Sequence, residues 1–133
     1  MAGSPDDGVR VLAAEGRTAP TGPATPGMHR LQALAADGVW LGTVDTEPGV
    51  LTGWHHHGDY ETYIYVTRGD ARLDTYVDGV IQRHDAGEGS FVVVPRHRIH
   101  REGSASAEGV QAVLVRIGSG EVTTNVDGLP DDD

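Results

Sequence analysis

From residue 38 onward, apolar and polar residues alternate in short runs that end at turn-forming pairs. The clearest runs are 38–46, 61–66, 71–77, 80–86 and 109–117, and the turn pairs between them include Pro48-Gly49, Arg68-Gly69 and Asp78-Gly79. A repeat of two residues is the repeat of a half-buried strand. An Asp-Gly pair between two such runs is a strong hairpin signal. The pattern therefore predicts an all-β domain of about eight short strands, arranged as a sandwich or a small barrel.

One segment departs from this pattern. In residues 28–37, MHRLQALAAD, the side chains of Leu31, Leu34 and Ala35 recur at helical spacing and a glycine follows. The preceding residues 18–27, TAPTGPATPG, form a Pro/Gly connector that holds neither a helix nor a central strand. We therefore expect one short N-terminal helix. The chain then divides into an N-terminal arm with this helix (1–37), a barrel (38–117) and a polar C-terminal tail (118–133).

Charge and composition limit the classes of binding partner and the cellular location that we expect. The chain has 133 residues, the usual size of one domain, and a formal net charge of −10. Such an acidic protein is a poor partner for nucleic acid or an anionic membrane. Cysteine is absent, and no apolar run approaches the roughly 18 residues of a membrane span. The first ten residues, MAGSPDDGVR, lack the apolar core of a signal peptide. We expect a cytoplasmic protein.

The candidate chemistry lies in residues 53–61, GWHHHGDYE. Side chains of a strand alternate between its faces, so His55 and His57 point to one side and His56 to the other. A His-x-His pair in a strand offers two metal ligands at once. The candidates for a third ligand are His84, His97 and His100. His100 is favoured, because it follows an apolar strand and a proline turn that would return its side chain to the interior.

Two motifs in this region resemble those of the cupins, which are double-stranded β-helix barrels of the jelly-roll type. The first motif has a glycine, five residues, His-x-His, three or four residues, a glutamate, six residues and a glycine. Its matches here are Gly49, His55, His57 and Gly69. In the second motif the matches are Gly89, Pro95 and His100, with His97 where a glycine is usual and Ser104 where an asparagine is usual. The resemblance covers roughly residues 38–117 and implies a cupin barrel.

The position of the glutamate in the first motif is ambiguous. Counting three residues forward from His57 reaches Glu61, whereas counting six residues back from Gly69 reaches Thr62. Strand alternation places Thr62, Ile64 and Val66 inward and Glu61 outward, although a bulge at the start of the strand would turn Glu61 inward. The sequence thus leaves two ligand sets: three histidines alone, or three histidines with Glu61.

The resemblance implies a divalent transition metal held by His55, His57 and His100. Iron, manganese, zinc, nickel and copper all suit such ligands. We expect an enzyme that acts on an oxygen-bearing small molecule, with dioxygenase-type oxidation as the leading reaction. A metal-assisted cyclase or isomerase, with Glu61 or His97 as general base, and a non-catalytic binding cupin are the alternatives. Because cupins commonly pair and outward-facing Trp, Tyr and Val residues are numerous, we also expect a homodimer.

Overall fold

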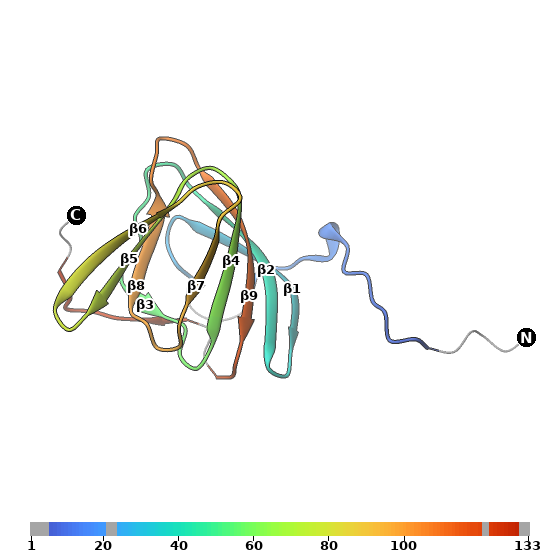
Figure 1. The fold of residues 1–133 in the computed structure, drawn as a ribbon. Helices are drawn as coiled ribbons and strands as arrows, with labels where there is room; N and C mark the ends of the chain where they lie inside the picture. The colour runs from blue at the N-terminus through green and yellow to red at the C-terminus, as the bar shows by residue number, and fades with distance from the viewer. Residues whose placement is uncertain (1–5, 21–23, 121–122, 131–133) are drawn as a thin grey trace, which may run out of the picture.

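The computed structural model describes residues 6–20, 24–120 and 123–130, whose strands form two five-stranded antiparallel sheets (Figure 1). The first sheet has the order β1-β2-β9-β4-β7 and consists of Met28–Ala36, Val39–Thr46, Val110–Ile117, Glu61–Arg68 and Phe91–Val94. The second has the order β10-β3-β8-β5-β6 and consists of Thr124–Asn125, His55–His56, His100–Ser104, Ala71–Val77 and Val80–Ala86. The all-β prediction is confirmed. The described strands form two separate sheets, so closure into a jelly-roll barrel stays a prediction.

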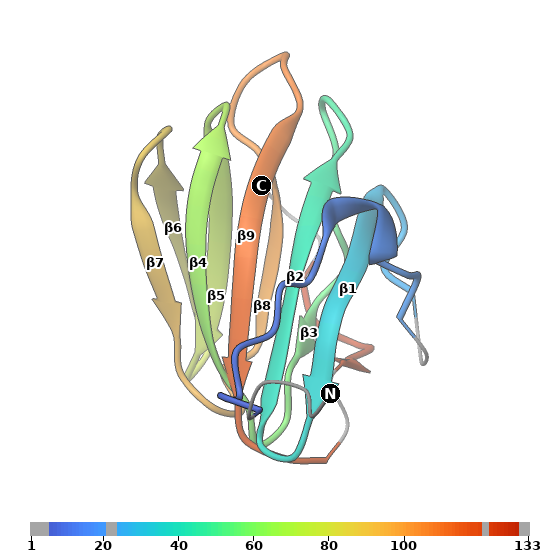
Figure 2. The ribbon, with the colours of Figure 1, turned by 90° about the vertical axis from the view of Figure 1, so that its right-hand side faces the viewer.

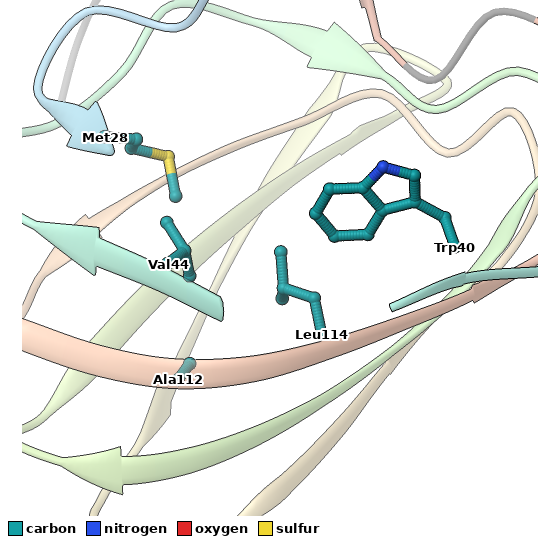
Figure 3. Packing of buried hydrophobic residues seen from close by; sticks show 5 residues of the cluster. All are labelled: Met28, Trp40, Val44, Ala112 and Leu114. Carbon is teal, nitrogen blue, oxygen red and sulfur yellow. The ribbon is translucent and has the colours of Figure 1, made fainter. Parts of the chain in front are cut away.

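The apolar core lies on the inner face of the first sheet, which Figure 2 shows in its strand order. Five side chains form it (Figure 3): Met28, Trp40, Val44, Ala112 and Leu114. Leu73 and Glu102 of the second sheet join Val44 and Leu114 in lining a cavity of about 50 Å³. The two sheets therefore share one interior. Apolar side chains fill one part of it, and polar side chains described below occupy another.

The hairpin predicted at Asp78-Gly79 is present. Val77 pairs with Val80 across Asp78-Gly79, and both turn residues have positive φ, 50° and 81°. That conformation is the one that two-residue hairpins require. The alternation predicted for β4 also holds, because Thr62 and Val66 are buried while Tyr63 and Tyr65 are exposed.

The predicted N-terminal helix over 28–37 is wrong. This segment is strand β1, which pairs along its length with β2, and the helical structure found is a 3-10 turn at Ala14–Gly16. The register shifts between Gln32 and Leu34, so a bulge interrupts the alternation of β1. This bulge explains the error, because one extra residue turns a period of two into spacings of three and four. Edge pairing with β2 then overrides the local helical preference.

The C-terminal segment holds the short strand β3 in place. β10 pairs with β3 on the side opposite β8, with Thr124 opposite His56. The indole Nε1 of Trp54 donates a hydrogen bond to the carbonyl oxygen of Pro130 at 2.7 Å, and Val126 N donates to the carbonyl oxygen of Trp54. The segment predicted as a polar tail thus contributes to the sheet. Its residues 131–133 and 121–122, like residues 21–23 of the predicted connector, lie outside the described residues.

A buried ion-pair network connects β5 to β8. The Asp74 carboxylate is 0% exposed and accepts hydrogen bonds from Arg101 Nε at 2.8 Å and Arg72 Nη2 at 2.9 Å. The Arg101 guanidinium also lies 4.5 Å from the ring centre of Trp54. Burial alone would raise the pKa of Asp74, but the two arginines lower it below its ordinary value of 3.8. The network therefore positions the strand that carries His100.

In the part of the chain that the structure describes, no helix is long and apolar enough to cross a membrane.

Replacing Asp74 by Asn should lower the free energy of unfolding by about 3 to 5 kcal/mol, because it breaks a buried ion pair from one side. The folded-state pKa lies below the unfolded value, so this stabilisation is present above about pH 3.8 and is lost as the pH falls further. Denaturant unfolding at pH 7 measures the loss. Asp85→Asn is the matched control, since Arg83 and Asp85 form the same pair on the exposed strand β6. Equal effects of the two substitutions would contradict the role of Asp74.

Candidate metal centre

Three histidine side chains meet in the interior. His55 lies on β3, His57 follows it directly, and His100 begins β8, where it is the register partner of His55. The side chains are 0%, 4% and 0% exposed, and one ring nitrogen of each lies within 4.8 Å of the others. A strand pair thus brings the two sequence motifs together, and these three residues could hold a metal ion.

Backbone contacts fix the orientation of two of the rings. Nδ1 of His55 lies 3.0 Å from the carbonyl oxygen of Gly53, and Nδ1 of His100 lies 2.8 Å from that of Arg98. A carbonyl oxygen only accepts, so each of these Nδ1 atoms carries a proton. Both Nε2 atoms are buried, and neither has a hydrogen-bond partner among the described residues. Such second contacts are the usual means of orienting a metal-binding imidazole.

Electrostatics keep two of these imidazoles neutral. Burial, and then the charge of His100, lowers the pKa of His55 from its ordinary 6.5 to about 4. Burial, and then the nearby Arg116, lowers the pKa of His57 well below its ordinary value. Metals bind the neutral imidazole, so at neutral pH these ligands do not first have to lose a proton.

A carboxylate that sequence reasoning missed accompanies the cluster. Glu102 Oε2 lies 3.3 Å from His100 Nε2, and its Oε1 lies 4.0 Å from His55 Nε2. Burial alone would raise the pKa of Glu102, but the contacts with His100, His55 and Arg30 hold it well below its ordinary value. The signal was available in the sequence, because His100-x-Glu102 in a strand places both side chains on one face, as in His55-x-His57.

Glu61 is not the residue that faces the cluster. Thr62 is 1% exposed and points inward, whereas Glu61 is only half-buried and accepts a hydrogen bond from the hydroxyl of Tyr63. The register of β4 runs from Glu61 through Val66 without a shift, so no bulge turns Glu61 inward. The backward count from Gly69 is therefore the one that matches the structure.

The other histidines lie away from the cluster. His56 accepts a hydrogen bond from the backbone N of Gly58, and His84 is exposed on β6. The side chain of His97 is 62% exposed and contacts Asp59 Oδ1 at 2.6 Å. Its φ of 59° is the left-handed conformation that a glycine adopts more easily, which explains why the motif usually has a glycine at this position.

Two buried arginines also border the interior, and the sequence motifs gave no sign of them. The side chain of Arg30 on β1 is 6% exposed, and its Nη2 lies 3.5 Å from Glu102 Oε1. Arg116 on β9 is 1% exposed. The interior therefore combines neutral imidazoles, one carboxylate and two guanidinium groups. Imidazole nitrogens with a carboxylate oxygen are donors that suit divalent transition metals.

The chain belongs to the cupin family. The family model described as the cupin domain matches residues 42–116, which is more than half of the chain. This match confirms the resemblance carried by the two histidine motifs. No curated protein matches the chain in sequence.

Solved structures share the fold at low identity. Oxalate decarboxylase from Bacillus subtilis is 17% identical with a TM-score of 0.66, and the match covers 77% of this chain and 28% of that chain. An oxalate oxidase is 16% identical with a TM-score of 0.66, covering 82% and 60%. Peruvianin-I, a cysteine peptidase from Thevetia peruviana latex, is 15% identical with a TM-score of 0.69, covering 93% and 80%. The chain thus spans less than a third of the decarboxylase, and these likenesses show the fold alone.

Proposed function

We propose that this protein is a metal-dependent cupin enzyme that acts on an oxygen-bearing small molecule, with dioxygenase-type oxidation as the leading reaction. The observation that carries the proposal is the convergence of three buried imidazoles, of which His55 and His100 each have an Nε2 atom with no hydrogen-bond partner among the described residues. Leaving such atoms unsatisfied destabilises a fold, and a bound ion would offset that loss. By their names, two structural neighbours act on oxalate, which is itself a small oxygen-rich molecule.

The proposed ligands are His55, His57 and His100, with Glu102 in place of the carboxylate that the first cupin motif usually supplies. Glu102 shares a face of β8 with His100 and already lies 3.3 Å from its Nε2. Iron or manganese suits two or more histidines with one carboxylate, whereas zinc, nickel or copper suits three histidines alone. When bound, such an ion activates dioxygen or polarises an oxygen atom of the substrate.

The chain's own residues set the charge of the carboxylate and the access of water at this site. The contacts with His100 and His55, and to a smaller extent Arg30 at 3.5 Å from Glu102 Oε1, lower the pKa of the Glu102 carboxyl. The two sheets keep bulk water from the cluster, because all three histidines are at most 4% exposed.

A second candidate function is that of a metal-assisted cyclase or isomerase. It is favoured by the same ionised Glu102, which would take the role of general base that the sequence assigned to Glu61 or His97.

Replacing His57 by Ala should abolish stoichiometric metal binding, because it removes one of three converging ligands. His56→Ala is the matched control and should leave the metal content unchanged, since its ring is bonded to Gly58 N outside the cluster. Elemental analysis of protein purified without added metal measures both. Equal metal content in wild type and His57→Ala would contradict the proposed metal site.

Replacing Glu102 by Gln should weaken metal binding by more than the roughly 10- to 100-fold typical of residues that only support a ligand. Glu61→Gln removes the same charge on β4 of the other sheet and should change the affinity little, because that side chain accepts a hydrogen bond from Tyr63. Metal titrations at one fixed pH compare the two variants, so that proton competition is constant. A larger loss in Glu61→Gln than in Glu102→Gln would reverse the assignment.

The reaction class has its own test. The metal-loaded protein should consume dissolved oxygen in the presence of small diketone, phenolic or carboxylate candidates, whereas a non-catalytic binding cupin should bind them without oxygen uptake. An oxygen electrode makes the measurement, with His57→Ala as the control. Turnover of a candidate without oxygen uptake would favour the cyclase or isomerase.

The homodimer and the cytoplasmic location stay proposals. Trp40 and Trp54 do not contribute to an interface surface, since they are 3% and 4% exposed. The outer face of β4, β7 and β9 instead carries a set of exposed apolar residues joined by the strand register: Tyr63, Tyr65, Phe91, Val93 and Val113. An apolar face of neighbouring strands favours a partner surface.

We expect sedimentation at micromolar concentration to give a dimer for the wild type and a monomer for Phe91→Glu, whose parent side chain is 79% exposed. Val80→Glu, at a 57% exposed position on β6 of the other sheet, is the control and should remain dimeric. A monomeric wild type would remove the proposal.

A further inference from the structure

The guanidinium of Arg116 is buried in the interior of the protein. Its residue is 1% exposed, and neither Nε nor Nη1 has a hydrogen-bond partner among the described residues. Its carbon Cζ lies 4.8 Å from the ring centre of Trp40, which supports one face of the group. The edge of a guanidinium, where its N–H bonds point, is what recognises an anion. In Arg116 those donors are left unused.

Thr62 presents a second unused polar group beside it. Thr62 on β4 is the register partner of Arg116 on β9, so the two residues lie directly opposite each other on neighbouring strands. Both are 1% exposed and belong to the inward sets of their strands. The Oγ1 atom of Thr62 also has no hydrogen-bond partner among the described residues. Two adjacent side chains therefore direct unsatisfied donors into the same interior.

These donors lie close to the histidine cluster. The charge of Arg116 is, after burial, the largest influence that lowers the pKa of His57. Glu102 is a source of opposite charge near Arg116, but no hydrogen bond or ion pair joins the two side chains. The Glu102 carboxylate instead contacts His100 and Arg30. Among the residues that the structure describes, no anion is therefore in contact with Arg116.

A buried charge without a contact partner is unfavourable for folding. Burial, followed by Arg30, lowers the pKa of Arg116 to about 9, so the group still carries its proton at neutral pH. An anion that binds only the folded protein would offset this loss and stabilise the fold in proportion to its occupancy.

We propose that Arg116 and Thr62 form the subsite that receives the carboxylate of the substrate, beside the histidine cluster. The inference deepens the proposed function by naming its substrate class, a small carboxylic acid. Only the reaction of that acid rests on the proposed function, whereas its binding at Arg116 does not. A carboxylate fits this pair because two parallel N–H groups of a guanidinium match its two oxygens, and a hydroxyl adds one donor. A phosphate has more oxygens and charge than these two residues satisfy.

The test measures binding of acetate and glycolate to the metal-loaded protein by calorimetry, with acetamide as the uncharged analogue. Wild type should bind both carboxylates and bind acetamide at least about tenfold more weakly. Arg116→Met should weaken carboxylate binding by roughly 10- to 100-fold, the loss expected for hydrogen bonds to charged groups. Thr62→Val, of equal shape, should weaken it by roughly 2- to 10-fold. Arg68→Met, at an exposed position of β4, is the control and should bind as wild type does.

Stability separates this role from a structural one. Without ligand, Arg116→Met should melt no lower than wild type, since it replaces an uncompensated buried charge by an apolar side chain of similar length. Acetate should raise the melting temperature of wild type and not that of the variant. If Arg116→Met does not fold, Arg116→Lys provides the second test: it keeps the charge without the paired donors and should still bind acetate more weakly than wild type.

The outcomes distinguish this inference from the metal proposal. Wild type that contains metal but binds no carboxylate, or an Arg116→Met variant that binds acetate as wild type does, overturns the subsite alone. Wild type that binds acetate through Arg116 without containing metal overturns the metal centre alone. Inorganic phosphate that binds more tightly than acetate and depends on Arg116 overturns the assignment of a carboxylate.

Discussion

The pairing of β3 with β8 is the contact on which the candidate site depends. It sets His55 opposite His100, joining residues that are 45 positions apart in the sequence. The strand β3 has only two residues, and it is held on its other side by β10 and by the contact of Trp54 with Pro130. The site therefore depends on the C-terminal segment as well as on the pairing of β3 with β8. A change in the register of this pair by one residue would turn the histidines to the opposite face.

Charge balance is the second constraint on the interior. Burying Glu102, Arg30 and Arg116 in one space is unfavourable unless each charge is compensated. Glu102 and Arg30 contact each other, and the imidazoles of His55 and His100 lie beside the carboxylate. Two nitrogen atoms of Arg116, Nε and Nη1, have no hydrogen-bond partner among the described residues, and Thr62 lies beside this arginine. A metal at the histidines would satisfy the Nε2 atoms of His55 and His100, and an anion at Arg116 would satisfy the donors of Arg116 and Thr62. The two proposals therefore reinforce each other and remain separately testable.

The neighbours illustrate how little the fold decides about the chemistry. Proteins named as an oxalate decarboxylase, an oxalate oxidase and a cysteine peptidase share it at 15 to 17% identity. Chemistry must therefore be argued from side chains. In this chain the carboxylate that contacts the histidines lies on β8, where Glu102 follows His100 by two residues. Thr62 stands in the usual position of the glutamate and leaves room for a different contact, the one that we assign to the substrate.

The sequence by itself determined those features that follow from local alternation and turn chemistry. Runs with a period of two became β2, β4, β5, β6 and β9, and the Asp78-Gly79 turn became a hairpin. The spacing of His55 and His57 put both on one face, and counting back from Gly69 put Thr62 inward. Each of these depends only on residues near one another in the chain.

Tertiary structure alone decided the rest. Residues 28–36 became an edge strand because β2 offered a partner and a bulge at Ala33 absorbed the helical spacing. Arg30 and Arg116 face the cluster because their strands are placed there by pairings with β2 and β4. No local pattern marks an arginine as buried, since burial of a charge depends on what surrounds it after folding. The physical reason is that a strand's sequence determines which side chains share a face, whereas its pairing partners determine what that face meets.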